Sequence, residues 1–198
     1  MSTNAPTVET GISPRPKRAD ARRNCDKVLT AARDAFAEGG ASTSLEEIAR
    51  RAQVGIGTLY RHFPNRQALL EAVYLDEVEQ LCQSAGDFAE LEPWDAFVGW
   101  LHRFVGYLGT KQALAHELLD YVDRDAAVFK CSREALYAAG EPLLKRAQDA
   151  HAVRADTDLS EILQMIGGIA KIPATAPDQI DHIFDIALDG LRYRAPAG

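Results

Sequence analysis

The chain has 198 residues, of which 46% are hydrophobic and 26% charged, an ordinary composition for a folded globular protein. Charge interrupts every apolar run well before the roughly 20 residues that a membrane span needs, and residues 1–20 contain no apolar segment typical of a secretory signal. Three widely spaced cysteines argue against a disulfide framework or a CxxC metal site and favour a cytoplasmic protein.

The net charge of −7 is unevenly distributed along the chain. Residues 1–70 hold 11 Lys and Arg against 7 Asp and Glu, a net of +4, whereas residues 71–198 hold 11 against 22, a net of −11. Basic charge in the first part favours contact with phosphates, and the acidic remainder would repel nucleic acid. We therefore expect two functional parts.

Residues 1–20 are rich in Pro, Thr and Ser and lack apolar periodicity, which predicts a disordered arm. Two interpretations of its basic end, with Arg15, Lys17 and Arg18, stay open. These side chains reach phosphates or an adjacent minor groove, or they form a solvated tail without fixed contacts.

A first helix is predicted from about Arg22 to Glu38, because its apolar residues recur at i, i+3, i+4 and i+7. A pair of glycines, Gly39-Gly40, ends it. A second helix begins after Ser44, which is expected to form a capping box with Glu47.

The second helix is predicted to end at Gln53-Val54-Gly55, and a third to run from Ile56 to about His62. Two short helices joined by a tight turn are typical of a helix-turn-helix, whose second helix enters the major groove of DNA. The sequence therefore predicts DNA binding at residues 44–70.

The remainder of the chain is expected to be helical, so the predicted fold class is all-α. The expected segments are Arg66–Ser84, Pro93–Leu108, Gln112–Val122, Asp125–Glu141, Pro142–Ala150, Asp158–Ile169 and Asp178–Tyr193. We expect a DNA-binding domain at residues 21–70 and an effector-binding and dimerisation domain at residues 71–198.

Residues 22–75 resemble the DNA-binding domain of TetR/AcrR-family transcriptional regulators. The matching elements are VLTAARDAFAEGG, TSLEEIARRA and VGIGTLYRHFPNRQALL, in that order. The later segment LLKRAQDAHAVRADTDLSEILQMIGGI resembles regulators with an SbtR-type C-terminal domain. The resemblance implies an N-terminal three-helix DNA-binding domain followed by a helical ligand-binding and dimerisation domain.

The resemblance also implies that Gly57, Thr58, Tyr60 and His62 contact DNA, with Tyr60 and His62 mostly on phosphates. The residue types agree, since Gly57 allows close approach and Thr58 and Arg61 can reach base edges. The N-terminal end of the second helix and Arg66 would contact phosphates of the DNA backbone. The predicted DNA-binding residues are Thr43, Ser44, Gly57, Thr58, Tyr60, Arg61, His62 and Arg66.

Two positions depart from the family pattern. Gln53 stands where many members have glycine, and a left-handed conformation there would cost about 1 kcal/mol or more. Gly55-Ile56 replaces a frequent Ser-Lys, which removes one cap and one cation from the start of the third helix. Base preference therefore cannot be borrowed from a relative.

The segment 94–108 is apolar around much of its circumference. Such a helix is buried on several sides, either as plain core or as the wall of a pocket. The resemblance favours the pocket, because the C-terminal domains of the family usually enclose an effector site. The predicted lining is Trp94, Phe97, Trp100, Phe104, Tyr107, Tyr121, Phe129, Tyr137 and Met165.

The apolar stripe of residues 178–193 is either core or a dimer seam. The resemblance implies that the last two long helices pair across a two-fold axis into a four-helix bundle. A dimer of this kind would bind a palindromic operator.

No catalytic residue, metal site or cofactor is predicted. His116 and Asp120 share a helix face around Glu117, similar to a metalloprotease HExxH, but Asp replaces the second His and no third ligand is identifiable. No G-x-S-x-G serine and no phosphate-binding glycine loop is present.

These features lead us to expect a cytoplasmic, homodimeric repressor that binds double-stranded DNA and leaves its operator when an unknown small molecule binds. Neither a membrane partner nor an enzymatic activity is expected. The alternatives are an activator, a ligand-independent repressor, and a helical ligand-binding protein or enzyme whose helix-turn-helix is vestigial.

Overall fold

The computed structural model describes residues 15–39, 43–121, 123, 126–173 and 178–193. Its helices are α1 (Arg15–Gly39), α2 (Leu45–Arg51), α3 (Ile56–His62), α4 (Arg66–Ser84), a 3-10 turn η2 (Ala85–Phe88), α5 (Pro93–Leu118), α6 (Ala127–Asp149), α7 (Leu159–Ile169) and α8 (Gln179–Leu191). The all-α prediction is confirmed. Within the described ranges, extended pairing is limited to one bridge between Val153 and Arg192.

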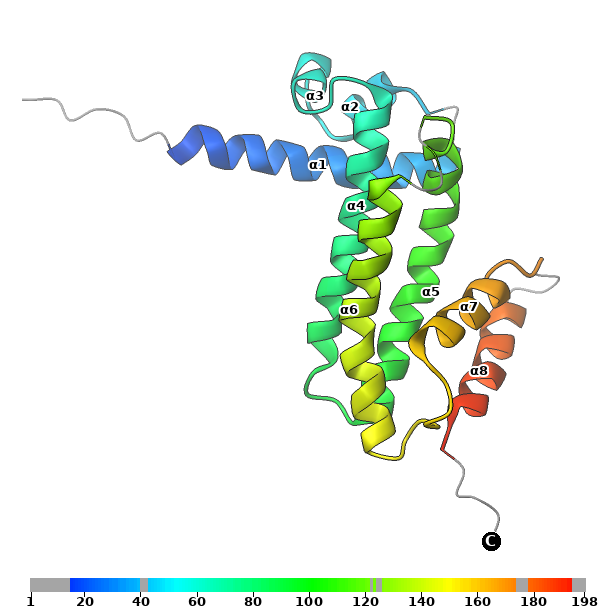
Figure 1. Ribbon diagram of the computed structural model, residues 1–198. Helices are drawn as coiled ribbons and strands as arrows, with labels where there is room; N and C mark the ends of the chain where they lie inside the picture. Colours follow the sequence, from blue (N-terminus) through cyan, green and yellow to red (C-terminus); the bar gives the residue numbers. More distant parts are fainter. Residues whose placement is uncertain (1–14, 40–42, 122, 124–125, 174–177, 194–198) are drawn as a thin grey trace, which may run out of the picture.

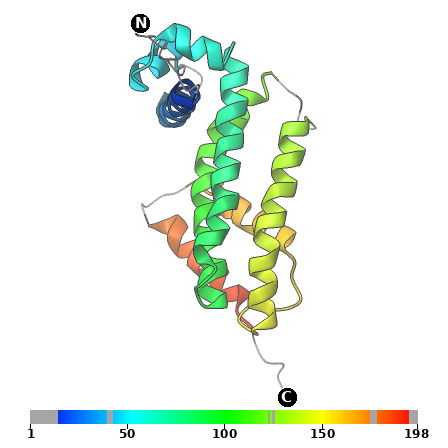
Figure 2. The same cartoon turned by 90° about the vertical axis from the view of Figure 1, so that its left-hand side faces the viewer.

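Three long helices, α4, α5 and α6, lie side by side and form the body of the molecule (Figures 1 and 2). Helix α1 crosses one end of this body, and the short helices α2 and α3 lie beyond it at the same end (Figure 1). Helices α7 and α8 lie beside α5 toward the other end. The predicted recognition helix and the predicted dimer helices are therefore at opposite ends.

Helix α1 begins at Arg15, seven residues before the predicted start. The proline at position 16 lies in the first helical turn, where a missing N–H breaks no helix hydrogen bond. An ion pair between Asp20 and Arg23 joins positions i and i+3 of the next turn. The basic residues 15, 17 and 18 thus belong to a helix and not to a disordered arm.

Helix α4 has the predicted bounds and belongs to both parts of the molecule. The Asn65 side chain accepts a hydrogen bond of 2.8 Å from the Ala68 N–H and caps its first turn. The hydrophobic side chains of α4 join one continuous core with those of α1–α3 and α5–α8. The expected domain boundary at residues 70–71 therefore falls inside a single rigid helix.

Helices α5 and α6 are each longer than predicted. The predicted helix ends at Leu108, yet α5 continues to Leu118 because Leu114 and Leu118 are buried in the core. Pro142 lies inside α6 instead of beginning a new helix. Pro142 is exposed. The steric clash with the preceding turn and the missing backbone hydrogen bond that proline causes therefore lie on the solvent-facing side of α6.

The C-terminal helices begin one residue after the predicted starts, which are their N-caps, Asp158 and Asp178. Asp158 and Glu161 form the expected capping box, with hydrogen bonds of 2.8 and 3.1 Å. The end of α8 is tied to the loop after α6, because the Arg154 N–H donates to the Leu191 carbonyl at 2.9 Å. In the described part of the chain, no helix is long and apolar enough to cross a membrane.

Candidate nucleic-acid interface

The start of α2 is capped as predicted, but only half of the expected capping box forms. Ser44 Oγ accepts a hydrogen bond of 3.1 Å from the Glu47 N–H. The Glu47 carboxylate turns away from the cap and instead binds Arg50 at 2.7 Å and Arg51 at 2.8 Å. Two cations on the following turn compete successfully with a single backbone N–H for this carboxylate.

The turn between α2 and α3 is closed by two backbone hydrogen bonds. The Val54 N–H donates to the Ala49 carbonyl at 3.0 Å, and the Gln53 N–H donates to the Arg50 carbonyl at 3.2 Å. This pair of bonds defines a Schellman motif, which requires a left-handed residue. Gln53 adopts that conformation with φ of 55°, at the position where many family members have glycine.

Helix α3 has the predicted bounds and two unlike faces. Leu59 is fully buried and Phe63, directly after the helix, is almost so. As expected, Gly55 provides no side-chain cap at its start. The helix is thus held by its apolar face and by backbone hydrogen bonds, with its other face directed away from the core.

Most predicted contact residues of α3 lie on the outer face. Tyr60 is 44% exposed, Arg61 and Gly57 are exposed, and Thr58 and His62 are half-buried. A β-carbon on Gly57 would meet no atom of the described residues within 4 Å, so packing within this part of the chain does not require glycine there. The outer face therefore combines a phenol, a guanidinium, a hydroxyl and a small residue, a set that suits phosphate and base contacts.

Two other predicted contacts, Thr43 and Arg66, are bound inside the protein. The Thr43 hydroxyl donates 2.8 Å to the Ala35 carbonyl at the end of α1, and the residue is buried. The Arg66 guanidinium donates to the Thr43 carbonyl and, at 2.7 Å, to a carboxylate oxygen of Glu117. It also lies 4.9 Å from the centre of the Phe36 ring. The predicted phosphate contacts of both residues stay predictions.

A surface network joins α2 to the end of α1. Arg51 bridges Glu38 at 2.7 Å and Glu47 at 2.8 Å. Hydrogen bonds from Arg50 and then Arg51 lower the pKa of Glu47 from its ordinary 4.5 to about 2. These basic side chains of α2 are therefore partly neutralised within the chain, unlike a row of uncompensated phosphate ligands.

The nine predicted pocket residues are divided among several surroundings. Phe97, Trp100, Phe104 and Tyr107 are buried, and Trp100 stacks on Phe104 with ring centres 6.2 Å apart. Tyr121 is 47% exposed. Their packing favours the plain-core interpretation for the buried members, and the pocket itself stays a prediction.

The other predicted pocket residues contact neighbouring helices. The Arg192 guanidinium lies 4.0 Å from the centre of a Trp94 ring, and Phe129 meets Tyr74 edge-on at 5.4 Å. The Tyr137 hydroxyl lies 3.1 Å from that of Ser160, and Met165 is exposed on α7.

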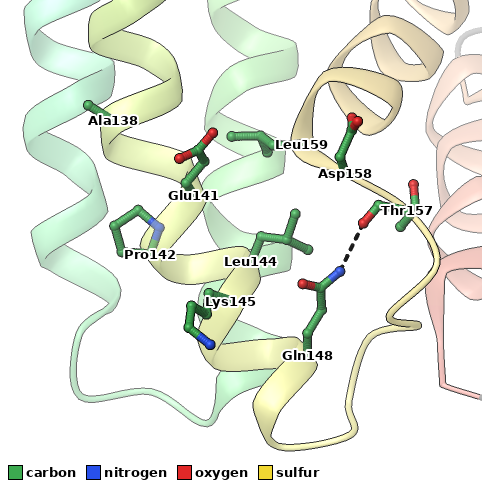
Figure 3. Close-up of a pocket in the computed structure, with 9 residues that line it drawn as sticks. All are labelled: Ala138, Glu141, Pro142, Leu144, Lys145, Gln148, Thr157, Asp158 and Leu159. Carbon is green, nitrogen blue, oxygen red and sulfur yellow. Dashed lines mark hydrogen bonds between the residues drawn. The ribbon is translucent and has the colours of Figure 1, made fainter.

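A groove of about 550 Å³ lies between α6 and the segment leading into α7 (Figure 3). Polar and apolar side chains both line it: Ala138, Glu141, Pro142, Leu144, Lys145, Gln148, Thr157, Asp158 and Leu159. Gln148 spans one end and donates 2.9 Å to the Thr157 carbonyl. None of the nine predicted pocket residues lines this groove, so it does not correspond to the predicted pocket.

The structure also brings together residues that the sequence analysis did not connect. Arg33 of α1 forms an ion pair with Asp76 at 2.5 Å and another with Glu77, both on α4. Glu117 was considered only within the HExxH-like segment, and its partner Arg66 precedes it by 51 residues. No local signal marks such a pair. The side chain of His116 lies outside the described residues.

The described residues contain no group of three His, Cys, Asp or Glu side chains that could hold a metal ion.

Comparison with known proteins identifies both parts of the chain. Residues 28–73 match the model for bacterial regulatory proteins of the tetR family, and residues 92–193 match the model for the C-terminal domain of SbtR-like transcriptional regulators. A TetR transcriptional regulator from Streptomyces coelicolor is 39% identical, with a TM-score of 0.76 over 86% of this chain and 99% of its own.

A TetR regulatory protein from Mycobacterium vanbaalenii is 34% identical, with a TM-score of 0.76 over 89% of this chain and 99% of its own. An HTH-type transcriptional regulator from Staphylococcus aureus is 35% identical over 83 residues, 40% of this chain and 44% of its own length. The chain therefore spans less than half of this curated relative.

Proposed function

The chain belongs to the TetR family of transcriptional regulators, which makes it a DNA-binding regulator and not an enzyme, and we propose that it is a cytoplasmic homodimeric repressor. In this proposal it binds a palindromic operator and leaves it when a small molecule binds the C-terminal domain. The observation that carries the DNA-binding role is the outer face of α3, with Tyr60, Arg61 and Gly57 exposed opposite the buried Leu59.

The proposed operator contacts follow from this face. Tyr60 and His62 bind phosphates, and Thr58 and Arg61 reach base edges. Ser44, at the start of α2, is exposed and offers a further contact to the DNA backbone. The charge split supports this arrangement, because the +4 part of the chain contains α3 and the −11 part contains the body.

The proposed dimer forms through α7 and α8. Ile186 is 60% exposed on α8, and Met165 is exposed on α7. On the same helix as Met165, β-carbons built on Gly167 and Gly168 would meet nothing within 4 Å among the described residues. Exposed apolar side chains and open space over these glycines suit close packing against a second copy, and TetR-family regulators act as dimers.

Release by a ligand requires two arrangements of the recognition helices. A ligand shifts the equilibrium only if it binds more tightly to the arrangement that does not match the operator. Helix α4 is the proposed connection, because it starts next to α3 and packs along α5 and α6.

The test is a binding titration with the upstream intergenic DNA at several salt concentrations. Wild-type protein is expected to bind one site specifically, and Tyr60→Ala together with His62→Ala to weaken binding by at least tenfold. Tyr193→Ala is the matched control, because this tyrosine has nearly the same exposure but follows α8, outside the helix-turn-helix. Specific binding that survives the double substitution contradicts the assigned contacts.

The alternatives separate in two further measurements. A promoter reporter in a deletion strain distinguishes repression, in which expression rises on deletion, from activation, in which it falls. A repressor without a ligand would keep its operator under all growth conditions. Complete absence of salt-sensitive specific binding would favour a vestigial helix-turn-helix.

A further inference from the structure

An ionic bridge joins the C-terminal body to the helix-turn-helix at one buried carboxylate. Glu117, near the end of α5, is only 5% exposed. Its Oε2 accepts a hydrogen bond of 2.7 Å from Arg66, the first residue of α4. The same guanidinium donates to the Thr43 carbonyl, one residue before the N-cap of α2. Three elements therefore meet at Arg66.

The bridge is connected further to α1. The Thr43 hydroxyl donates to the Ala35 carbonyl, and the Arg66 guanidinium lies over the Phe36 ring. Arginine suits this position because its planar fork donates in two directions at once and stacks on an aromatic face. A displacement of the end of α5 would thus pull on the starts of α2 and α4 and on the end of α1 together.

The ion pair between Arg66 and Glu117 is poorly suited to stabilising the folded state. Among the described residues, Glu117 Oε1 is buried without a hydrogen-bond partner. A buried, half-satisfied carboxylate carries a desolvation cost that one ion pair does not reliably recover. An apolar residue would fill this place at lower cost, so the charge is better explained by the geometry that it imposes.

We propose that Glu117 is a positioning residue for operator binding, which holds Arg66 so that the helix-turn-helix keeps a fixed orientation on the body. This role rests on the proposed use of α3 on the operator. It assigns Arg66 a purpose other than phosphate binding. Because Glu117 belongs to the ligand-binding part of the chain, the bridge is also a direct route by which a change at α5 reaches α2 and α4.

The test compares Glu117→Gln, Arg66→Gln, Arg66→Lys and the Glu117→Gln/Arg66→Gln pair. Affinities for operator and for unrelated DNA are measured over a range of salt, after the active fraction has been determined by stoichiometric titration. Each single variant is expected to lose roughly tenfold in specific affinity, the range of a typical coupling between sites. The double variant is expected to lose no more than either single variant.

Two readouts separate positioning from other roles. Affinity for unrelated DNA and its salt dependence should stay unchanged, and Arg66→Lys should behave like Arg66→Gln because an ammonium lacks the fork. If Arg66 instead binds phosphate, Arg66→Gln should weaken all DNA binding and reduce the salt slope by about one, while Arg66→Lys and Glu117→Gln bind normally. That result overturns the proposal.

Hydrogen exchange of the protein without DNA tests the role of the Glu117–Arg66 bridge independently of DNA binding. Glu117→Gln is expected to speed exchange in residues 43–64 but not in α7 or α8. Tyr137→Phe is the control, since it removes a contact between α6 and α7 far from the bridge. Unchanged exchange in residues 43–64 overturns the proposal, whatever the DNA result. Failure of wild-type protein to bind any operator would contradict the proposed function. Hydrogen exchange would still test whether Glu117 and Arg66 hold the orientation of the helix-turn-helix.

Discussion

The indole of Trp100 on α5 lies directly against the backbone of Gly140 on α6. A β-carbon built on Gly140 would fall 2.5 Å from Cη2 of Trp100 and 2.9 Å from Cδ2 of Leu159. Trp100 is fully buried, and its Nε1 donates to the Leu81 carbonyl at 3.3 Å. The indole ring is therefore enclosed by its neighbours, and α5, α6 and α7 pack closely together at Gly140.

Gly140→Ala is expected to destabilise the protein by about 1–3 kcal/mol, the usual cost of an overpacked core. Urea unfolding followed by circular dichroism measures this difference. Gly106→Ala on α5 is the matched control, because a β-carbon there meets nothing within 4 Å. This control should stabilise the helix by ~0.5–1 kcal/mol. Equal effects of the two substitutions would contradict the packing argument.

The strained turn residue Gln53 leads to a stabilising substitution. At its φ of 55°, any residue with a β-carbon has a steric cost that glycine does not have. Gln53→Gly should therefore raise the free energy of unfolding by about 1 kcal/mol. Gln53→Ala keeps the β-carbon and should give no comparable gain. A thermal melt of both variants distinguishes relief of backbone strain from loss of the side-chain amide.

The acidic end of the pH range tests the Glu47 network. Arg50 and Arg51 lower the pKa of Glu47 to about 2, so protonation disfavours the folded state. This contribution to stability is fully present above pH 4.5 and is lost as the pH falls through about 2. An NMR titration should place the midpoint of this carboxylate near 2. The Arg50→Gln/Arg51→Gln pair should return it toward 4.5, whereas Lys145→Gln, on the remote helix α6, should not.

Local signals in the sequence were sufficient to predict several elements. The bounds of α3 and α4 follow from caps, breakers and apolar spacing within a few residues. The resemblance to the TetR family was equally local, since its three motifs lie in one stretch of the chain. These features depend on neighbours that the sequence displays side by side.

Features that depend on distant residues were not predicted. Pro142 ends no helix, because the packing of α6 on the body outweighs one lost hydrogen bond. The ion pair between Arg66 and Glu117 was not predicted, since the two residues are 51 positions apart. The aromatic residues of α5 could not be assigned to core or pocket, because sequence spacing does not reveal that Gly140 brings α6 against Trp100.

The proposed dimer can be tested through Ile186, the most exposed large hydrophobic residue of α8. Ile186→Glu would place a charge in the apolar contact between two copies, where water could not solvate it. We expect this variant to be monomeric in sedimentation experiments while keeping its helical spectrum. Operator affinity should then fall by roughly a hundredfold or more, because two linked recognition helices bind with the advantage of high effective concentration.

Leu91→Glu is the matched control, since Leu91 is 48% exposed in the segment between η2 and α5, outside α7 and α8. This variant should remain dimeric and bind the operator normally. A dimer that persists in Ile186→Glu would place the seam elsewhere. Loss of the dimer without loss of operator affinity would show instead that a single helix-turn-helix accounts for the measured binding.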